Sequence, residues 1–234
     1  EKLGIGNIGT LNDAIVAGRG RETILVSEAL HERRIAEIAA QIAQESRRIK
    51  VVLVSGPSAS GKTTFSRRLS IQLLALGLSP FPVELDSFFV ERDRTPRDEQ
   101  GEYDYEALAA LDLVTLNRDL KDLIAGNVVR LPRYNFVTGQ REEGQEVQLA
   151  SGHLIILEGI HGLNPELVPG IPPESAFRIY VSALTQLNLD RYNRVSTTDT
   201  RLIRRIVRDA AQRGYSAADT IRRWESVRRG EKRY

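Results

Sequence analysis

Short apolar runs alternate with longer amphipathic segments along most of the chain. Four runs are apolar at nearly every position, which is typical of strands buried on both faces of a parallel sheet. These runs cover residues 50–56, 81–86, 153–159 and 176–182. Elsewhere apolar positions recur at helical spacing, and the predicted helices cover 61–77, 104–126 (as one or two helices), 184–194, 199–213 and 216–229. The alternation predicts an α/β fold, in which helices flank a parallel sheet.

The beginning of the chain departs from this alternation. Residues 1–20 are rich in glycine and asparagine and show no sustained period. Residues 27–48 have apolar positions at helical spacing and predict one amphipathic helix. We therefore expect residues 1–48 to form a lead-in segment and residues 49–234 to form the main domain.

A second departure lies in the middle of the chain. Residues 127–136 and 144–149 predict two paired strands, which would form a small β-hairpin. The polar and glycine-containing stretch at 137–144 predicts the turn between them. This hairpin would stand outside the parallel sheet.

Composition excludes several classes of protein. Apolar residues make up 41% of the chain and charged residues 27%, which are ordinary values for a globular protein. No apolar run approaches 18 residues and no signal-peptide pattern opens the chain, so we expect no membrane partner. Cysteine is absent, which excludes disulfides and thiol chemistry and favours a cytoplasmic location. Methionine is also absent, even at position 1, which favours a fragment of a longer chain.

Positive charge gathers in the last part of the chain. Residues 201–234 hold eleven Lys or Arg against four Asp or Glu, whereas the remainder holds twenty-two against twenty-seven. Such a block can bind nucleic acid, a membrane surface or a polyphosphate, and it can also be a solvated helix face. Arg201, Arg204 and Arg208 stand at i, i+3 and i+7, on one helix face, which suits the oxygens of a triphosphate.

The stretch GPSASGKTT follows one predicted strand and opens a predicted helix. It fits the pattern G-x-x-x-x-G-K-[ST], in which glycines let backbone amides turn toward phosphate oxygens. Lys62 is expected to reach the outer phosphates, and the hydroxyl of Thr63 is expected to bind magnesium (Mg²⁺). The residues expected to contact the nucleotide are Gly56, Ser58, Ser60, Gly61, Lys62, Thr63 and Thr64.

Two carboxylates end apolar strands. Asp86 ends the run at 81–86, and Glu158 lies at the end of the run at 153–159. The carboxyl ends of parallel strands meet at one edge of a sheet, beside the loop that binds the phosphates. A kinase that acts on a hydroxyl needs one carboxylate to accept the proton and another acidic group to hold the metal. Either acid could instead be a simple helix cap, but the pair together favours a kinase.

Five further motifs follow the phosphate loop in a fixed order. They are DSFF at 86–89, YDYEAL at 103–108, LPRYNF at 131–136, LEGIHGL at 157–163 and DTRLIRRIVRD at 199–209. Together with the loop, they resemble the uridine kinase and phosphoribulokinase family of P-loop kinases over residues 50–229. The pattern is most similar to bacterial uridine or nucleoside kinases with a threonyl-tRNA-synthetase-like N-terminal region, and residues 1–48 resemble the end of that region.

The resemblance implies a role for individual residues. Asp86 would be the general base, Glu158 would help to bind magnesium, and Asp104 would hold the hydroxyls of the acceptor sugar. Tyr134 would pack near the base of a nucleoside, and arginines of a helical lid at about 199–213 would cover the phosphates. The residues assigned to catalysis are Asp86, Lys62 and Arg204. Those assigned to the nucleotide also include Arg204 and Arg208. Those assigned to the acceptor are Asp86, Phe88, Asp104, Tyr134, His161 and Arg201.

The expected activity is transfer of the γ-phosphoryl group of ATP, with Mg²⁺, to the 5′-hydroxyl of a nucleoside. Uridine–cytidine kinases carry a histidine that reads the pyrimidine shortly after the LPRYNF motif, and the aligned residue here is Gly139. A sugar-phosphate kinase resembling phosphoribulokinase is therefore one alternative, because YNFVTG and EGIH resemble its motifs. A nucleotide-dependent RNA-binding or regulatory module that uses the basic block is the other. Nucleic acid is not the favoured partner, and a homo-oligomer is compatible with the sequence.

Overall fold

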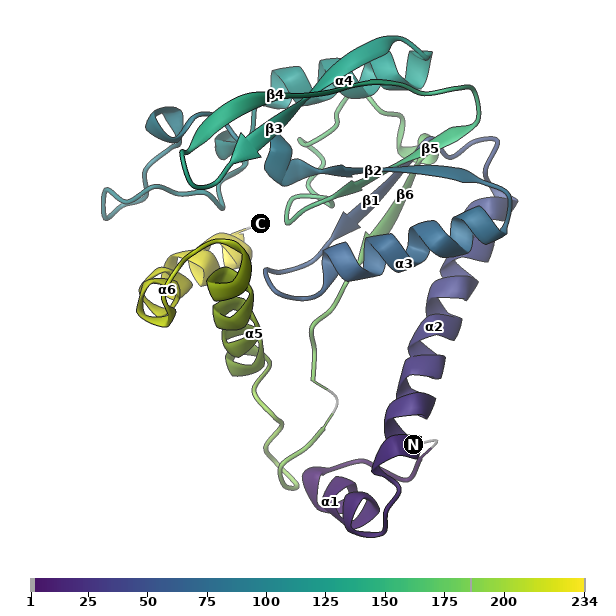
Figure 1. Ribbon diagram of the computed structural model, residues 1–234, viewed down its shortest axis with the longest axis vertical. Helices are drawn as coiled ribbons and strands as arrows, with labels where there is room; N and C mark the ends of the chain where they lie inside the picture. The colour runs from purple at the N-terminus through teal and green to yellow at the C-terminus, as the bar shows by residue number, and fades with distance from the viewer. Residues whose placement is uncertain (1–2, 186, 234) are drawn as a thin grey trace.

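The computed structural model describes residues 3–185 and 187–233 of the chain (Figure 1). It confirms the predicted α/β fold, because helices flank a four-stranded parallel sheet and a two-stranded hairpin stands beside it. Over the described residues, every helix is too short or too polar to cross a membrane.

All strands of the main sheet run parallel, in the order β2–β5–β1–β6. They span Ser79–Glu84 (β2), His153–Glu158 (β5), Val51–Ser55 (β1) and Ala176–Tyr180 (β6). The register places Glu158 level with Val54 of β1 and with Glu84 of β2. The segments that follow β1 and β2 therefore leave the sheet beside Glu158, at a single edge.

Apolar side chains are buried on both faces of this sheet. The elements that cover it are α2 (Gly20–Gln44) and α3 (Lys62–Ala75) on one face, and α4 (Leu113–Ala125) with the hairpin of β3 (Val128–Asn135) and β4 (Gln140–Gln148) on the other. Side chains alternate along a strand, so Val52 and Val54 of β1 pack with α2 and α3. Val51 and Leu53 point the other way and pack with α4. Burial on both faces explains why these strands are continuous apolar runs.

The N-terminal segment contains two helices where the sequence predicts one. The unexpected helix, α1 (Ile8–Val16), begins at a capping box in which the side chain of Asn7 accepts from the backbone N–H of Thr10 at 2.9 Å. The second, α2, extends the predicted helix at its start and ends at Gln44 rather than Arg48. A cap signal, and not an apolar period, specifies α1.

The prediction of a helix at 184–194 is wrong for the residues that the structure describes there, which are 184, 185 and 187–194. None of these residues is helical. Asp190 Oδ1 accepts from the backbone N–H groups two and three residues further on, at 2.7 and 2.8 Å. Asn188 forms an isolated bridge with Arg194. Short polar side chains compete with helix formation for backbone groups in this way, and here they outweigh the apolar spacing.

The hairpin turn is shorter than the predicted turn at 137–144, because β4 already begins at Gln140. Asn135 Oδ1 accepts from the backbone N–H groups two and three residues on, at 3.0 and 3.2 Å. Gly139 then adopts φ +73°, which favours glycine. The first half of β4 is polar because it is mostly exposed, so its composition resembles that of a turn.

The C-terminal helices α5 (Thr197–Gln212) and α6 (Ala217–Arg233) confirm the helices predicted at 199–213 and 216–229. They stand across from the start of α3, as Figure 1 shows. The segment at 104–126 is helical only from Leu113, after a short 3₁₀ turn, because Asp112 caps α4 by accepting from the backbone N–H three residues on.

Candidate active site

The loop after β1 has a backbone geometry that only small residues allow. Gly56 has φ +155°, and a Cβ on it would lie 2.4 Å from the carbonyl oxygen of Val181. Ala59 and Gly61 also have positive φ, at +59° and +102°. Successive residues of this kind turn their amides into an anion-binding concavity, and α3 directs its positive N-terminus at the same space. The loop is therefore shaped to hold phosphate oxygens.

The first residues of α3 meet the end of β5. Thr63 Oγ1 donates to Glu158 Oε1 at 2.6 Å, and Lys62 Nζ donates to the carbonyl oxygen of Pro57 at 3.2 Å. Burial raises the pKa of Glu158, and the hydrogen bond from Thr63 and the charge of Lys62 oppose this rise. Burial lowers the pKa of Lys62, and the neighbouring carboxylates, Glu158 first, oppose this fall. The ammonium and the carboxylate therefore stabilise each other's charged forms.

Thr63 and Glu158 together fit a magnesium ion. A hydroxyl and a carboxylate oxygen are the hard donors that Mg²⁺ prefers. In the described part of the chain, no three His, Asp or Glu side chains gather into a metal-binding cluster. Mg²⁺ commonly takes only one or two protein ligands and completes its shell with phosphates and water. Two protein ligands beside a phosphate loop are therefore enough for an ion that binds together with a triphosphate.

Asp86 lies just past β2, in a 3₁₀ helix that spans Leu85–Phe88. Its side chain is 45% exposed, and Arg213 NH2 lies 3.3 Å from its Oδ2. It lines a cavity of about 720 Å³ whose wall also includes Lys62, Thr63 and Glu158. A group bound in this cavity can therefore meet a carboxylate, an ammonium and a metal-binding pair together.

All three predicted lid arginines lie close to the loop or the cavity. Arg208 lines the cavity, and its Nε and NH2 donate to Asp209 Oδ1 at 3.0 and 2.8 Å. Arg204 is exposed, but a Cβ on Gly61 would lie only 3.5 Å from its NH2. Both positions are compatible with the predicted contacts to the phosphates. Of the other predicted loop contacts, Ser60 lies within the loop and Thr64 lies in the first turn of α3.

The sequence places Arg201 beside the acceptor, but in the structure its side chain is held outside the cavity. Its Nε donates to the carbonyl oxygen of Ser58 at 2.9 Å, and its NH2 forms an ion pair with Glu231 of α6. Glu231 Oε1 also accepts from the backbone N–H of Ser58 at 2.6 Å. The guanidinium packs 5.2 Å from the ring of Trp224, and Arg201 is not among the residues that line the cavity. Arg201 therefore joins the loop to both C-terminal helices.

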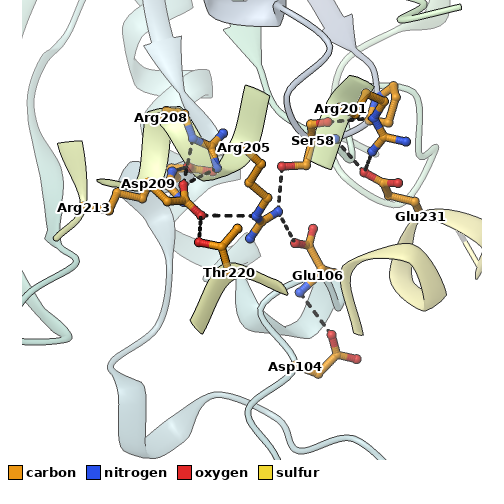
Figure 2. Close-up of polar contacts among 12 residues, drawn as sticks. Ser58, Asp104, Glu106, Arg201, Arg205, Arg208, Asp209, Arg213, Thr220 and Glu231 are labelled. Carbon is orange, nitrogen blue, oxygen red and sulfur yellow. Dashed lines mark hydrogen bonds and ion pairs between the residues drawn. The ribbon is translucent and has the colours of Figure 1, made fainter. Parts of the chain in front are cut away.

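Arg205 also lines the cavity, although the sequence does not predict it as a site residue. Its NH1 donates to Ser58 Oγ at 2.7 Å and lies 3.8 Å from Glu106 Oε1, while its Nε lies 3.3 Å from Asp209 Oδ2 (Figure 2). On a helix, the positions three and four residues after Arg201 flank it at similar angles. Spacing alone therefore cannot choose between residues 204 and 205, and only the packing of α5 does so.

Glu106 takes the place in the cavity that the sequence assigns to Asp104. Glu106 lines the cavity, whereas Asp104 does not and instead accepts from the backbone N–H of Glu106 through its Oδ1, at 3.1 Å. Burial raises the pKa of Glu106 to about 7, although the charge of Arg205 opposes the rise. Glu106 therefore presents its carboxylate to the cavity, and Asp104 shapes the turn that holds it.

Glu106→Gln is expected to stabilise the protein at pH 8. The folded-state pKa of Glu106 is about 7 and its ordinary value is 4.5, so the folded state binds more protons than the unfolded state between these values. Stability therefore falls as pH rises from 4.5 to 7, by roughly 1–3 kcal/mol, and stays lower above pH 7. Denaturant unfolding at pH 5 to 8 measures this, with the exposed Glu99→Gln as control. A stability difference that does not grow with pH would contradict the expectation.

Two predicted aromatic contacts lie in the core rather than in the cavity. Phe88 is 1% exposed and belongs to the hydrophobic core, because the 3₁₀ turn points it inward and leaves Phe89 to line the cavity. Tyr134 is 6% exposed and packs edge-on against Phe89 and Phe136, with ring centroids 5.5 and 5.2 Å away. His161 does line the cavity as predicted, and burial lowers its pKa, so the neutral imidazole is favoured.

The hairpin turn at Gly139 packs directly against Arg92. A Cβ on Gly139 would lie 2.5 Å from Arg92 Nε, and the backbone N–H of Arg92 donates to the carbonyl oxygen of Gly139 at 2.9 Å. Arg92 NH2 also donates to the carbonyl oxygen of Phe136 at 2.9 Å. A guanidinium therefore fills the space that a side chain at position 139 would need.

A phosphate loop, a hydroxyl and a carboxylate that fit magnesium, and a second carboxylate lie at one cavity, which is the arrangement expected of a P-loop kinase. The chain belongs to the Phosphoribulokinase / Uridine kinase family, whose model matches residues 51–234, and membership of this family implies the use of ATP.

Proteins with different names resemble this chain in sequence or in fold. The uridine kinase of Ligilactobacillus salivarius (strain UCC118) is 30% identical over 177 residues, which are 76% of this chain and 74% of the relative. The uridine kinase of Limosilactobacillus reuteri (strain DSM 20016) is 28% identical over 178 residues, 76% of this chain and 73% of the relative. A crystal structure described as a fructose transport system kinase, from Silicibacter sp. TM1040, has a TM-score of 0.58 at 18% identity, over 85% of this chain and 94% of that one. The last similarity concerns the fold alone.

Proposed function

We propose that this protein is an ATP-dependent kinase that transfers the γ-phosphoryl group to a hydroxyl of a sugar-like acceptor. The observation that carries the proposal is that Asp86 faces the same cavity as Lys62 and the Thr63–Glu158 pair. Transfer to a hydroxyl needs a carboxylate that accepts the proton of the nucleophile, and binding of a triphosphate alone does not.

The roles of the residues follow from their positions. Asp86 accepts the proton of the acceptor hydroxyl, while Arg213 holds its carboxylate in place. Lys62 and Arg208 neutralise charge on the transferring phosphoryl group. Magnesium, when bound by Thr63 and Glu158, supplies further neutralisation of the triphosphate. Closure of α5 and α6 over the cavity would exclude water, which otherwise competes with the acceptor.

A nucleoside that offers its 5′-hydroxyl is the first acceptor to test, because two relatives at 28–30% identity are named uridine kinases. A sugar phosphate is the second candidate, and the contact between Arg92 and Gly139 favours it. RNA is a weaker candidate, because Arg201, Arg205 and Arg208 of α5 engage groups within the protein rather than forming an outward stripe.

We also propose that residues 49–234 form the kinase domain and that residues 1–48 belong to a separate lead-in. Ile35 and Ala39 of α2 are fully buried against the core that contains α3, so the lead-in is anchored to the domain. This anchoring supports a role for α2 in stability rather than in catalysis.

A coupled assay for ADP tests the proposed function. Uridine, cytidine, adenosine, ribulose 5-phosphate and free sugars are offered with ATP and Mg²⁺, and ATP alone measures background hydrolysis. At least one acceptor is expected to raise ADP formation above background and to yield a phosphorylated product. ADP release that no acceptor increases, across a wide panel, would refute the proposal.

A further inference from the structure

The cavity continues, beyond Asp86, into a smaller hollow of about 410 Å³ between the hairpin turn and the end of α5. Most of its lining is of two kinds: the side chains of Arg92, Arg213 and Arg223, and the rings of Tyr105, Phe136 and Tyr215. No Asp or Glu is among the described residues that line it. The hollow therefore combines three positive charges with aromatic walls.

Mostly neutral groups hold the three arginines in position. Arg92 donates to the carbonyl oxygen of Phe136, and Arg213 lies 4.5 Å from the centroid of the same ring. Arg223 lies 4.5 Å from the ring of Tyr215. Carbonyl oxygens and ring faces orient a guanidinium without cancelling its charge. Arg213 NH2 also lies 3.3 Å from Asp86 Oδ2, which compensates part of the positive charge of the hollow.

We propose that this hollow is an anion subsite, and that the acceptor carries a phosphate or carboxylate group bound by Arg92, Arg213 and Arg223. This inference rests on the proposed function, since it names the class of acceptor that the cavity takes. Guanidinium groups bind both anions through paired N–H donors, and the rings cover the carbon skeleton between them. Arg213 contacts both the candidate base and the hollow, so the reacting hydroxyl and the anionic group would lie on either side of it.

The glycine at position 139 supports the inference. Any larger side chain there would displace Arg92, whose Nε would lie 2.5 Å from its Cβ. The guanidinium of Arg92 therefore occupies the space beside the hairpin turn that a side chain at position 139 would fill. A neutral nucleoside would bring no anionic group to the three arginines of the hollow, whereas an anionic acceptor would.

Binding can be measured separately from catalysis. The full chain is saturated with Mg²⁺ and a non-hydrolysable ATP analogue, so that phosphate probes cannot enter the loop. Calorimetry then measures the affinity for ribose 5-phosphate, glycerate, ribose and uridine. We expect the phosphate or the carboxylate probe to bind at least about tenfold more tightly than the neutral probes, and added salt to weaken that binding. The two anionic probes distinguish a phosphate from a carboxylate.

Arg92→Gln and Arg223→Gln are expected to weaken anion binding by roughly tenfold to a hundredfold each. Their matched controls are Arg94→Gln and Arg228→Gln, which change exposed arginines in the same segments but outside the hollow. Equal affinity for neutral and anionic probes, or anion affinity unchanged in both hollow variants, would overturn the inference. Because no phosphoryl transfer is involved, an inactive protein that still binds anions would refute the proposed function and leave the subsite standing.

Discussion

Asp86→Asn is expected to lower the rate of phosphoryl transfer by about a thousandfold or more, with ATP affinity close to that of the unchanged protein. The substitution keeps the shape of the side chain but removes the group that accepts the proton of the hydroxyl. The hydrogen bonds of Lys62 and Thr63 go to Pro57 and Glu158 rather than to Asp86, so they remain when Asp86 is changed. Single-turnover transfer and fluorescent-nucleotide binding measure the two quantities independently.

Asp93→Asn is a matched control for this experiment. Asp93 is an exposed acid a few residues further on, in the 3₁₀ helix Arg92–Arg94, and does not line the cavity. It is expected to behave like the unchanged protein. Arg213→Gln separates the base from its partner, since it keeps the Asp86 carboxylate and removes the guanidinium 3.3 Å away. Near-normal turnover in Asp86→Asn would remove Asp86 as the base.

Lys62→Met is expected to lower transfer by roughly a hundredfold to a thousandfold and also to weaken ATP binding. The ammonium is partly buried and faces Glu158, with Asp86 and Glu106 nearby, so its removal also leaves several carboxylates without their shared cation. The loss in rate is therefore expected to shrink, but not disappear, at lower pH, where Glu106 is protonated.

Rates and nucleotide affinities of Lys62→Met between pH 6 and 8 measure this effect. Lys121→Met, an exposed lysine on α4, is the matched control and is expected to show neither change. A variant that binds ATP weakly but turns over normally at saturating ATP would contradict a role for Lys62 in the chemical step, because only its contribution to the ground state would then be missing.

Rules that act over a few residues predict well the part of the candidate site that would bind ATP. The backbone at positions 56 and 61 has positive φ, which favours glycine at both positions. The strand before these glycines and the helix after them follow from the apolar pattern. Asp86 and Glu158 come together because parallel strands end at one edge of a sheet. Each of these inferences needs only the order of elements, which the sequence specifies.

The acceptor end could not be predicted in the same way, because it depends on tertiary packing. A 3₁₀ turn after β2 decides that Phe89, and not Phe88, lines the cavity. The rotation of α5 decides that Arg205 reaches Ser58, and a turn at Asp104 presents Glu106. In each case the sequence identifies a segment that borders the cavity, and packing decides which of its residues faces the cavity. Side chains one or two positions apart on a helix or in a turn point in different directions, so a small error in position selects a side chain that points elsewhere.

Ser58 connects the two substrates of the proposed reaction. Its N–H, carbonyl and hydroxyl groups each contact α5 or α6, through Glu231, Arg201 and Arg205. Arg213 and Arg223, which line the acceptor hollow, belong to the same C-terminal region. A triphosphate that rearranges the contacts of Ser58 would thus also move the arginines that receive the acceptor. Thermodynamic linkage then requires each substrate to change the affinity for the other by the same factor, so the dissociation constant of the acceptor would change when a non-hydrolysable ATP analogue is bound.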